Sequence, residues 1–440
     1  MDMLKSGTEE PGVGCAITFV FGILMERPAE GINWRLQLCS HATKGTQWTH
    51  PRTGKKKVVS GDLPFGWEKC VSEDGKIFYV DHVNRRTTYT DPRLAFATEE
   101  KEHPHDFRQR YDGSTTALQI LHGRDLTGKV AVITGANTGI GYETARSLAF
   151  HGCIVVFACR SQSRAEAAIA KIQAERPNAR CNFIELDLCS LASVKMFVVN
   201  FRHIYQSLDY LILNAGIFGL PFSLTGDGYE TLFQVNHLSH FYLTLLLLSS
   251  LHSSSRVVVV SSESHRSSDL CLNNISQSKL SPSSGSHYWS LMAYNHSKLC
   301  NILFANELAR RCLDKGVCVN SLHPGNLVSS DLPRHWWFYR LLFTLVRPFT
   351  KSLQQAAATT VYCATAPDLD SVSGMYFNNC CRCEPSEAAQ DYDLAQELWR
   401  ISMKMVGDTM GRSAMLLPMR KSPVFEQASS DDETNMGQNL

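Results

Sequence analysis

Short apolar runs that alternate with helical stretches constrain the fold of this 440-residue chain more than any other feature. Each run is rich in β-branched residues and is shorter than a typical helix, so each indicates a strand. Strands separated by helices lie parallel, in a sheet that helices cover on both faces. The sequence therefore predicts an α/β fold with a doubly wound parallel sheet, whose strands are Val130–Thr134, Cys153–Cys159, Cys181–Asp187, Leu208–Leu213, Arg256–Ser262 and Val317–Leu322.

A glycine-rich turn joins the first of these strands to a helix predicted over Tyr142–Phe150. Its glycines allow a tight turn and let the backbone approach a pyrophosphate at the helix N-terminus. The spacing Gly-x-x-x-Gly-x-Gly differs from the usual dinucleotide fingerprint, and a plain loop is the alternative. The strand before and the helix after favour a cofactor site, formed by Gly135, Ala136, Asn137, Thr138, Gly139, Ile140 and Gly141.

The residue that ends the second strand indicates which cofactor is used. NAD-binding folds place an acidic residue about 20 residues beyond the glycines, where it binds the ribose 2′-hydroxyl. Arg160 stands there instead, and its guanidinium suits the 2′-phosphate of NADP. A solvated arginine at a strand end is the alternative. We predict NADP, with NAD less favoured, and place Asp187 beside the adenine.

Further motifs fall at the carboxyl ends of the strands, the edge at which such sheets bind ligands. They are Asn214-Ala215-Gly216, Ser262 and Pro324-Gly325. Downstream of Ser262, Tyr294 and Lys298 stand four residues apart, so a helix places both on one face. A nearby ammonium favours a phenolate, so we expect Lys298 to lower the pKa of Tyr294 for acid–base work.

This order of motifs resembles the short-chain dehydrogenase/reductase family over roughly residues 125–415. The stretch Asn236–Phe241 and the long gap between Ser262 and Tyr294 are similar to the retinol-dehydrogenase-like branch. The resemblance implies a Rossmann-type sheet and an oxidoreductase that acts on an apolar alcohol or carbonyl, retinoid-like or steroid-like.

The same resemblance implies a role for each residue of the site. Tyr294 is the catalytic acid/base, and Lys298 lowers its pKa and holds the nicotinamide ribose. Ser262 bonds the substrate oxygen, and Asn236 supports a water relay behind Lys298. Pro324 and Gly325 line the nicotinamide, so that Tyr294, Lys298, Asn214, Ala215, Gly216, Pro324 and Gly325 all contribute to cofactor binding.

Three points in the motif set leave the fit of cofactor and substrate open. Ser261 and Ser264 are rivals for the serine position, although Ser262 matches it better. Ser239 stands where the branch usually has glycine. The segment Asn326–Ser330 lacks the threonine that the family often has there.

The N-terminal quarter carries a second module, at residues 58–96. Leu63–Trp67 and Lys76–Pro92 fit three short strands with polar turns, and they resemble a WW domain, which binds proline-rich peptides. The resemblance places the peptide groove on Phe78, His82, Thr87 and Tyr89. Phe78 and Tyr89 replace the usual Tyr and Trp, so we expect only weak binding of proteins that contain Pro-Pro-x-Tyr.

The remaining segments are divided by composition. Residues 1–40 are divergent and expected to be disordered, and residues 41–57 resemble the second half of another WW domain with a basic stretch. Two of three strands cannot bury a core, so this remnant should not fold. Residues 97–124 are expected to be a linker, and residues 416–440 a disordered acidic tail.

Charge and cysteine usage narrow the choice of partners and compartment. The net charge of +1 gives no bulk attraction to nucleic acid. The apolar stretch Val13–Met25 is too short to span a bilayer and lacks the flanks of a signal peptide, so we expect a cytoplasmic protein, with nuclear and mitochondrial locations left open. The thiols are therefore expected to be reduced, and no metal site is predicted at Cys380–Cys383.

Two functions remain in competition. The apolar segment 336–346 favours a lid over an apolar substrate, with a membrane-surface contact as its rival. The predicted function is an NADP(H)-dependent oxidoreductase, and the pairing with WW modules implies growth-suppressing, pro-apoptotic signalling. The alternative is an adaptor that recruits Pro-Pro-x-Tyr partners and uses the dehydrogenase fold as a cofactor-sensing scaffold. The sequence leaves the oligomeric state open.

Overall fold

The computed structural model describes residues 63–93, 110–325 and 351–411, and the backbone of five short strands outside them. The chain divides into two compact units, which are taken separately below. The short strands are β1 (Trp34–Arg35), β2 (Leu38–Cys39), β3 (Thr46–Gln47), β4 (Lys57–Val59) and β8 (Thr98–Glu99), paired as β1–β4–β8 and β2–β3. Apart from these strands, the predictions for residues 1–40, 41–57, 336–346 and 416–440 lie outside the described residues.

The first unit contains the predicted three-stranded antiparallel sheet. Its strands are β5 (Trp67–Val71), β6 (Ile77–Asp81) and β7 (Arg86–Thr88), and each pairs antiparallel with the next. Tyr79 lies in its interior, and its hydroxyl donates a hydrogen bond to Asp91 at 3.0 Å. Arg93 also pairs with Asp91, at 2.7 Å, so the segment after β7 is fixed to the central strand.

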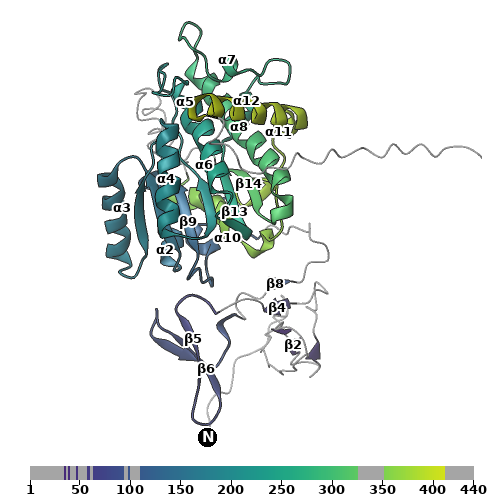
Figure 1. Ribbon diagram of the computed structural model, residues 1–440. Helices are drawn as coiled ribbons and strands as arrows, with labels where there is room; N and C mark the ends of the chain where they lie inside the picture. Colours follow the sequence, from purple (N-terminus) through teal and green to yellow (C-terminus); the bar gives the residue numbers. More distant parts are fainter. Residues whose placement is uncertain are drawn as a thin grey trace, which may run out of the picture. The chain divides into compact units, whose positions relative to one another are not determined.

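The second unit is built on an eight-stranded sheet in the order β11-β10-β9-β12-β13-β14-β15-β16. Its first seven strands pair parallel, which confirms the doubly wound α/β fold (Figure 1). The strands are β9 (Val130–Thr134), β10 (Ile154–Cys159), β11 (Cys181–Glu185), β12 (Leu208–Leu213), β13 (Leu251–Val260), β14 (Cys318–His323), β15 (Tyr376–Asn378) and β16 (Cys381–Cys383).

Helices cover both faces of this sheet, because alternate residues of its strands point to opposite sides. On β12, Tyr210 and Ile212 belong to one apolar core, whereas Leu211 and Leu213 belong to the other. The first core includes α1 (Ala117–Ile120), α2 (Gly139–Phe150), α3 (Gln162–Glu175) and α10 (Leu353–Thr365). The second includes α4 (Leu191–Ile204), α5 (Thr231–Phe233), α6 (Ser239–Leu247), α8 (Ser290–Arg311), α11 (Glu387–Gln390) and α12 (Tyr392–Met410).

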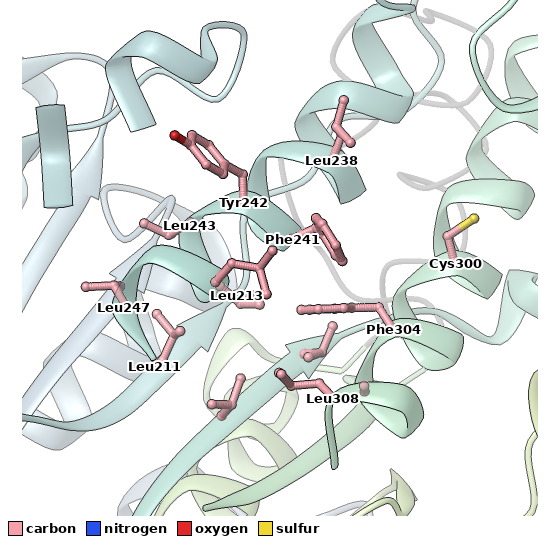
Figure 2. Close-up of a cluster of buried hydrophobic side chains, with 14 of the residues drawn as sticks. Leu211, Leu213, Leu238, Phe241, Tyr242, Leu243, Leu247, Cys300, Phe304 and Leu308 are labelled. Carbon is pink, nitrogen blue, oxygen red and sulfur yellow. The ribbon is translucent and has the colours of Figure 1, made fainter. Parts of the chain in front are cut away.

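The second core is packed around aromatic side chains of α6, α8 and α12. Phe241 of α6 and Phe304 of α8 lie over Leu211 and Leu213 (Figure 2). Trp399 of α12 contacts both rings, with centroids 4.9 Å from Phe241 and 6.1 Å from Phe304. The C-terminal helix therefore closes the core over the helix that carries the Tyr-x-x-x-Lys pair.

A π-helical turn, η2 (Gln234–Leu238), interrupts the helix between α5 and α6. Such turns occur often at functional sites, and this one carries Asn236. The next residue, His237, is buried and its Nε2 hydrogen-bonds the Ser402 hydroxyl of α12 at 3.1 Å. The C-terminal helix thus also holds the irregular turn in place.

The structure corrects several element boundaries. β13 ends at Val260 and β11 at Glu185, so Ser262 and Asp187 follow their strands rather than end them. β15 and β16 were not predicted, and they form an antiparallel hairpin at one edge of the sheet. α1 is packed in the first core, so part of the predicted 97–124 linker belongs to the dehydrogenase unit.

Short helices complete the description: α7 (Gln277–Leu280) and the 3-10 helices η3 (Glu263–Ser267), η4 (Leu313–Lys315) and η6 (Pro367–Leu369). Within the described residues, no helix combines the length and the apolar character that crossing a bilayer requires.

Two buried histidines should make this fold sensitive to acid. Burial lowers the pKa of His237 to about 3 and that of His240 to about 4, against about 6.5 in an unfolded chain. Below about pH 6.5 both histidines become protonated in the unfolded chain but stay neutral in the folded chain. The free energy of unfolding therefore decreases as the pH is lowered. Each histidine should remove roughly 2 kcal/mol of unfolding free energy between about pH 7 and about pH 5.

Urea unfolding of the parent and of His237→Asn at both pH values tests this expectation. The difference in unfolding free energy between the two pH values should be smaller in the variant than in the parent, by the contribution of one histidine. This holds whatever the stability of the variant at neutral pH. An unchanged difference between the two pH values would show that His237 is not the titrating group.

Candidate active site and peptide-binding face

The loops at the carboxyl edge of the sheet meet at Thr134, the last residue of β9. Its hydroxyl accepts the backbone N–H groups of Asn214 and Ala215, each at 2.9 Å. The hydroxyl proton then remains to be donated, and His240 Nε2 accepts it at 2.9 Å. His240 therefore carries its own proton on Nδ1 and donates it to the Asn236 carbonyl at 3.2 Å. One hydroxyl links the ends of two strands to the π-helical turn.

The glycine-rich turn after Thr134 has the geometry of a phosphate cradle. Gly135 and Gly139 adopt φ angles of 69° and 60°, in the left-handed region that favours glycine. A Cβ on Gly141 would lie 2.5 Å from both the Asn214 side-chain amide and the Gly135 carbonyl oxygen. Beside Gly139 a Cβ would meet no described atom within 4 Å, so the first turn of α2 faces open space. The backbone N–H groups of that turn suit a pyrophosphate.

The two residues predicted to contact the adenosine half follow adjacent strands. Arg160 directly follows β10 and is exposed, and no hydrogen bond or ion pair joins it to other described residues. Asp187 lies two residues beyond β11, which pairs with β10, and accepts the Cys189 N–H at 3.0 Å. Arg160 and Asp187 therefore lie at the same edge of the sheet as the glycine turn.

Tyr294, Lys298 and Ser262 come together beside β13. Tyr294 and Lys298 are buried on α8, with Lys298 Nζ 5.5 Å from the centroid of the Tyr294 ring. Lys298 also donates to the Val260 carbonyl at 3.2 Å. The Ser262 hydroxyl accepts the Ser264 N–H at 3.3 Å and is hydrogen-bonded to the Tyr294 phenol.

The two rival serines point elsewhere. The Ser261 hydroxyl donates to the Lys298 main-chain carbonyl at 2.7 Å, so it holds α8 against β13. The Ser264 hydroxyl is buried and has no hydrogen-bond partner among the described residues. Among the three, Ser262 is the serine that faces the Tyr294 phenol.

We expected Lys298 to lower the pKa of Tyr294, and for the protein groups alone this expectation is wrong. Burial raises the pKa of Tyr294 to about 12, and the hydrogen bond from Ser262 opposes this only in part. Burial also lowers the pKa of Lys298 to about 8. Removing both groups from water disfavours both charged forms, and this outweighs their mutual attraction. At neutral pH Tyr294 is therefore a protonated phenol.

Asn236 braces the loop after β12 against α8. Its Oδ1 accepts the Ile217 N–H at 2.8 Å, and its Nδ2 donates to the Ile217 carbonyl at 3.1 Å and to the Ser297 hydroxyl at 3.0 Å. Ser297 in turn donates to the Tyr294 main-chain carbonyl at 2.8 Å. The side chain of Asn236 is thus engaged with protein, and a water relay behind Lys298 stays a prediction.

The loop after β14 begins at the same edge. Pro324 and Gly325 follow His323, and Gly325 has a φ of 113° with the Lys351 side chain packed where a Cβ would stand. The segment Asn326–Ser330, where the family threonine is missing, lies outside the described residues. The buried Ser239 hydroxyl donates to the Leu188 carbonyl at 2.6 Å, so it is accommodated where glycine was expected.

One aromatic side chain contacts the Tyr294 ring, and the sequence did not single it out. Phe218 lies edge-on to Tyr294, with ring centroids 4.9 Å apart. Phe222 contacts Tyr288 in the same way at 5.5 Å, and the Tyr288 hydroxyl donates to the buried Glu230 carboxylate at 3.0 Å. His240 was also missed as a site residue, although its i+4 spacing from Asn236 on a helix was visible.

The small sheet of the first unit presents the predicted peptide-binding residues. Phe78 and Tyr89 have ring centroids 6.4 Å apart, and Tyr89 is 74% exposed. The exposed His82 pairs with Glu68 across the sheet at 2.8 Å. Thr87 lies on β7 opposite Val80. The face therefore offers two adjacent rings, but a peptide that needs His82 must compete with Glu68.

Comparison with known proteins accounts for both units. The family described as short chain dehydrogenase matches residues 129–284, and the family described as WW domain matches residues 63–92. The WW domain-containing oxidoreductase of Drosophila melanogaster is 57% identical over 369 residues, which cover 83% of this chain and 90% of that protein. That of Homo sapiens is 54% identical over 376 residues, covering 84% and 91%. Retinol dehydrogenase 12 of Mus musculus is 42% identical over 295 residues, covering 67% and 89%.

The geometry of the small sheet predicts weak peptide binding. A Pro-Pro-x-Tyr peptide should bind with a Kd no better than about 100 μM, which is roughly −5.5 kcal/mol. Tyr89→Trp should tighten binding, because the larger ring adds stacking area and an N–H donor. Isothermal titration of the full chain measures both.

Tyr89→Phe is the matched control, since it removes the hydroxyl without adding area, and its affinity should stay near that of the parent. Low-micromolar affinity in the parent would show that Phe78 and Tyr89 already form a competent groove.

Proposed function

Since this chain belongs to the WW domain-containing oxidoreductases of the short-chain dehydrogenase family, we propose that it reduces an apolar carbonyl compound with NADPH. The observation that carries the proposal is the buried group formed by Ser262, Tyr294 and Lys298 at the carboxyl edge of the sheet. The glycine turn at the same edge of the sheet, with open space beside Gly139, supports binding of the cofactor there.

The protonation state of Tyr294 supports reduction as the direction for which the resting enzyme is prepared. A phenol with a pKa of about 12 is protonated at neutral pH and can donate a proton to a carbonyl oxygen. The bound nicotinamide cofactor would supply a hydride to the carbonyl carbon. A substrate oxygen that contacts both Ser262 and Tyr294 would replace the hydrogen bond between them, so Ser262 stabilises the developing negative charge. Lys298, 5.5 Å from the Tyr294 ring, then stabilises the phenolate that is left.

The surroundings of Tyr294 support an apolar substrate. Phe218 places aromatic surface beside the phenol, and Phe222 and Tyr288 pack against each other. The likeness to mouse retinol dehydrogenase 12 points in the same direction, toward a retinoid-like compound, with a steroid-like one as the alternative. NADP is proposed over NAD because the exposed Arg160 stands where a 2′-phosphate would lie.

A second function rests on the WW domain. The half-buried ring of Phe78 and the exposed ring of Tyr89 support docking of proline-rich segments, which would bring the oxidoreductase to partner proteins.

Removing the phenolic hydroxyl tests the proposed chemistry. Tyr294→Phe should leave NADPH binding intact and lower the turnover of all-trans-retinal by about 10²-fold to 10⁴-fold, the usual cost of losing an acid–base group. Tyr242→Phe is the control, because it removes a buried hydroxyl that has no hydrogen-bond partner among the described residues. Steady-state kinetics with both variants measure this. Near-parent turnover in Tyr294→Phe would exclude Tyr294 as the proton donor.

Reversing one charge tests cofactor choice. The parent should bind NADPH more tightly than NADH, and Arg160→Asp should lose most of that preference, because each charge-assisted hydrogen bond to the 2′-phosphate contributes about 1.5–3 kcal/mol. Arg180→Asp makes the same charge change at the amino end of β11 and should keep the preference. Fluorescence titrations with both cofactors decide it, and equal parent affinities would contradict the assignment.

A further inference from the structure

His265 contacts the main chain of Ser262. It belongs to η3 and is 1% exposed. Its Nδ1 lies 2.7 Å from the Ser262 main-chain oxygen, and its Nε2 lies 3.0 Å from the backbone nitrogen of Ser386. Ser386 stands directly before α11, in the C-terminal part of the unit. One imidazole thus joins the residue that faces Tyr294 to a segment far along the chain.

The two partners of His265 leave it one protonation state. The Ser386 backbone N–H can only donate, so His265 Nε2 must present its lone pair. The Ser262 carbonyl can only accept, so His265 Nδ1 must carry the proton. A protonated imidazolium would direct an N–H at the N–H of Ser386. The neutral Nδ1–H tautomer is therefore the form that satisfies both contacts.

The helix that carries His265 is fixed to the same C-terminal segment by further contacts. The His265 ring lies edge-on to Tyr376 of β15, with centroids 5.2 Å apart. The Tyr376 hydroxyl donates to the Glu263 carboxylate at 3.3 Å, and Arg266 donates to the Glu384 carbonyl at 2.7 Å. Because these anchors hold η3 as a whole, the bond from His265 Nδ1 bears specifically on the Ser262 peptide group.

We infer that His265 is a positioning residue that holds the Ser262 peptide plane and thereby aims the Ser262 hydroxyl at the Tyr294 phenol and at the substrate oxygen. The inference rests on the proposed function of Ser262. Ser262 has extended backbone angles, φ −155° and ψ 154°, and its hydroxyl direction depends on how that peptide group is held. Without the bond from His265 Nδ1, the one hydrogen bond left to the Ser262 carbonyl within the described residues is that from the His265 backbone N–H, at 3.1 Å.

Two substitutions test the two ring nitrogens of His265 separately. His265→Asn places an amide where Nδ1 stands, so it can keep the bond to the Ser262 carbonyl and loses the acceptor for Ser386. His265→Gln places its amide where Nε2 stands, so it can keep the acceptor for Ser386 and loses the bond to Ser262. Both remove the ring contact with Tyr376, so a merely structural role predicts equal effects.

The first readout is the phenol carbon signal of Tyr294 in protein labelled with ¹³Cζ-tyrosine, assigned by its absence in Tyr294→Phe. Ser262→Ala sets the shift expected when the hydrogen bond to the phenol is lost. His265→Gln should move the signal toward that value, and His265→Asn should leave it near the parent. Equal shifts in both variants, or no shift in either, would overturn the inference.

The second readout is kinetic, with all-trans-retinal and NADPH as probes. His265→Gln should lower kcat by about tenfold or more with little change in the NADPH Kd, because a misaimed donor acts mainly on the reacting oxygen. His265→Asn should keep kcat within about threefold of the parent. If the parent reduces no carbonyl while the ¹³C pattern holds, the proposed function fails and the positioning of Ser262 stands.

If the histidine variants do not fold, substitutions at Ser386 test the same hydrogen bond from the other side. Ser386 has a φ of −64°, which proline adopts, so Ser386→Pro removes the N–H with little backbone strain, and Ser386→Ala keeps it. In ¹⁵N spectra, His265 should stay in the Nδ1–H tautomer in Ser386→Ala and become a mixture in Ser386→Pro. A parent His265 in the Nε2–H tautomer would contradict the contact that the inference requires.

Discussion

The rest of the catalytic unit depends on keeping a phenol and an ammonium out of water, side by side on α8. A buried Tyr294 cannot ionise easily, and a buried Lys298 holds its proton weakly, with pKa values of about 12 and about 8. To exclude water, α8 must be covered by protein, and its residues from Tyr294 to Ala305 are all buried. The covering elements are η3, the π-helical turn and α12, which explains why the C-terminal helix is packed as part of the core.

Several buried polar groups around this pair share the same hydrogen-bonding atoms. The Thr134 hydroxyl serves two backbone N–H groups and His240, and Asn236 serves Ile217 and Ser297. An unpaired polar group in such a place would cost about 1–3 kcal/mol, so these contacts hold the strand ends in one arrangement. A Cβ added at Gly139 in the neighbouring glycine turn would meet no described atom within 4 Å.

Much of this could be predicted from the sequence, because apolar periodicity and motif order are local signals. The bounds of β9 and β12 were predicted to the residue, and the motifs after the strands do gather at one edge. The shift of the Tyr294 pKa was predicted in the wrong direction. The helical spacing shows that Lys298 is a neighbour of Tyr294, but the burial that raises the pKa depends on the whole fold. His265 was missed for a related reason: its partner Ser386 is distant in the chain, and no local pattern joins them.

The most direct test of the account is the ionisation of Tyr294 in the cofactor-free protein. The ¹³Cζ signal of labelled tyrosine, assigned with Tyr294→Phe, can be followed from about pH 6 to about pH 10. If burial controls the site, Tyr294 keeps the shift of a neutral phenol over this whole range. A shift to the phenolate value at about pH 7 to pH 8 would show that Lys298 dominates instead, and would contradict the assignment of Tyr294 as a resting proton donor.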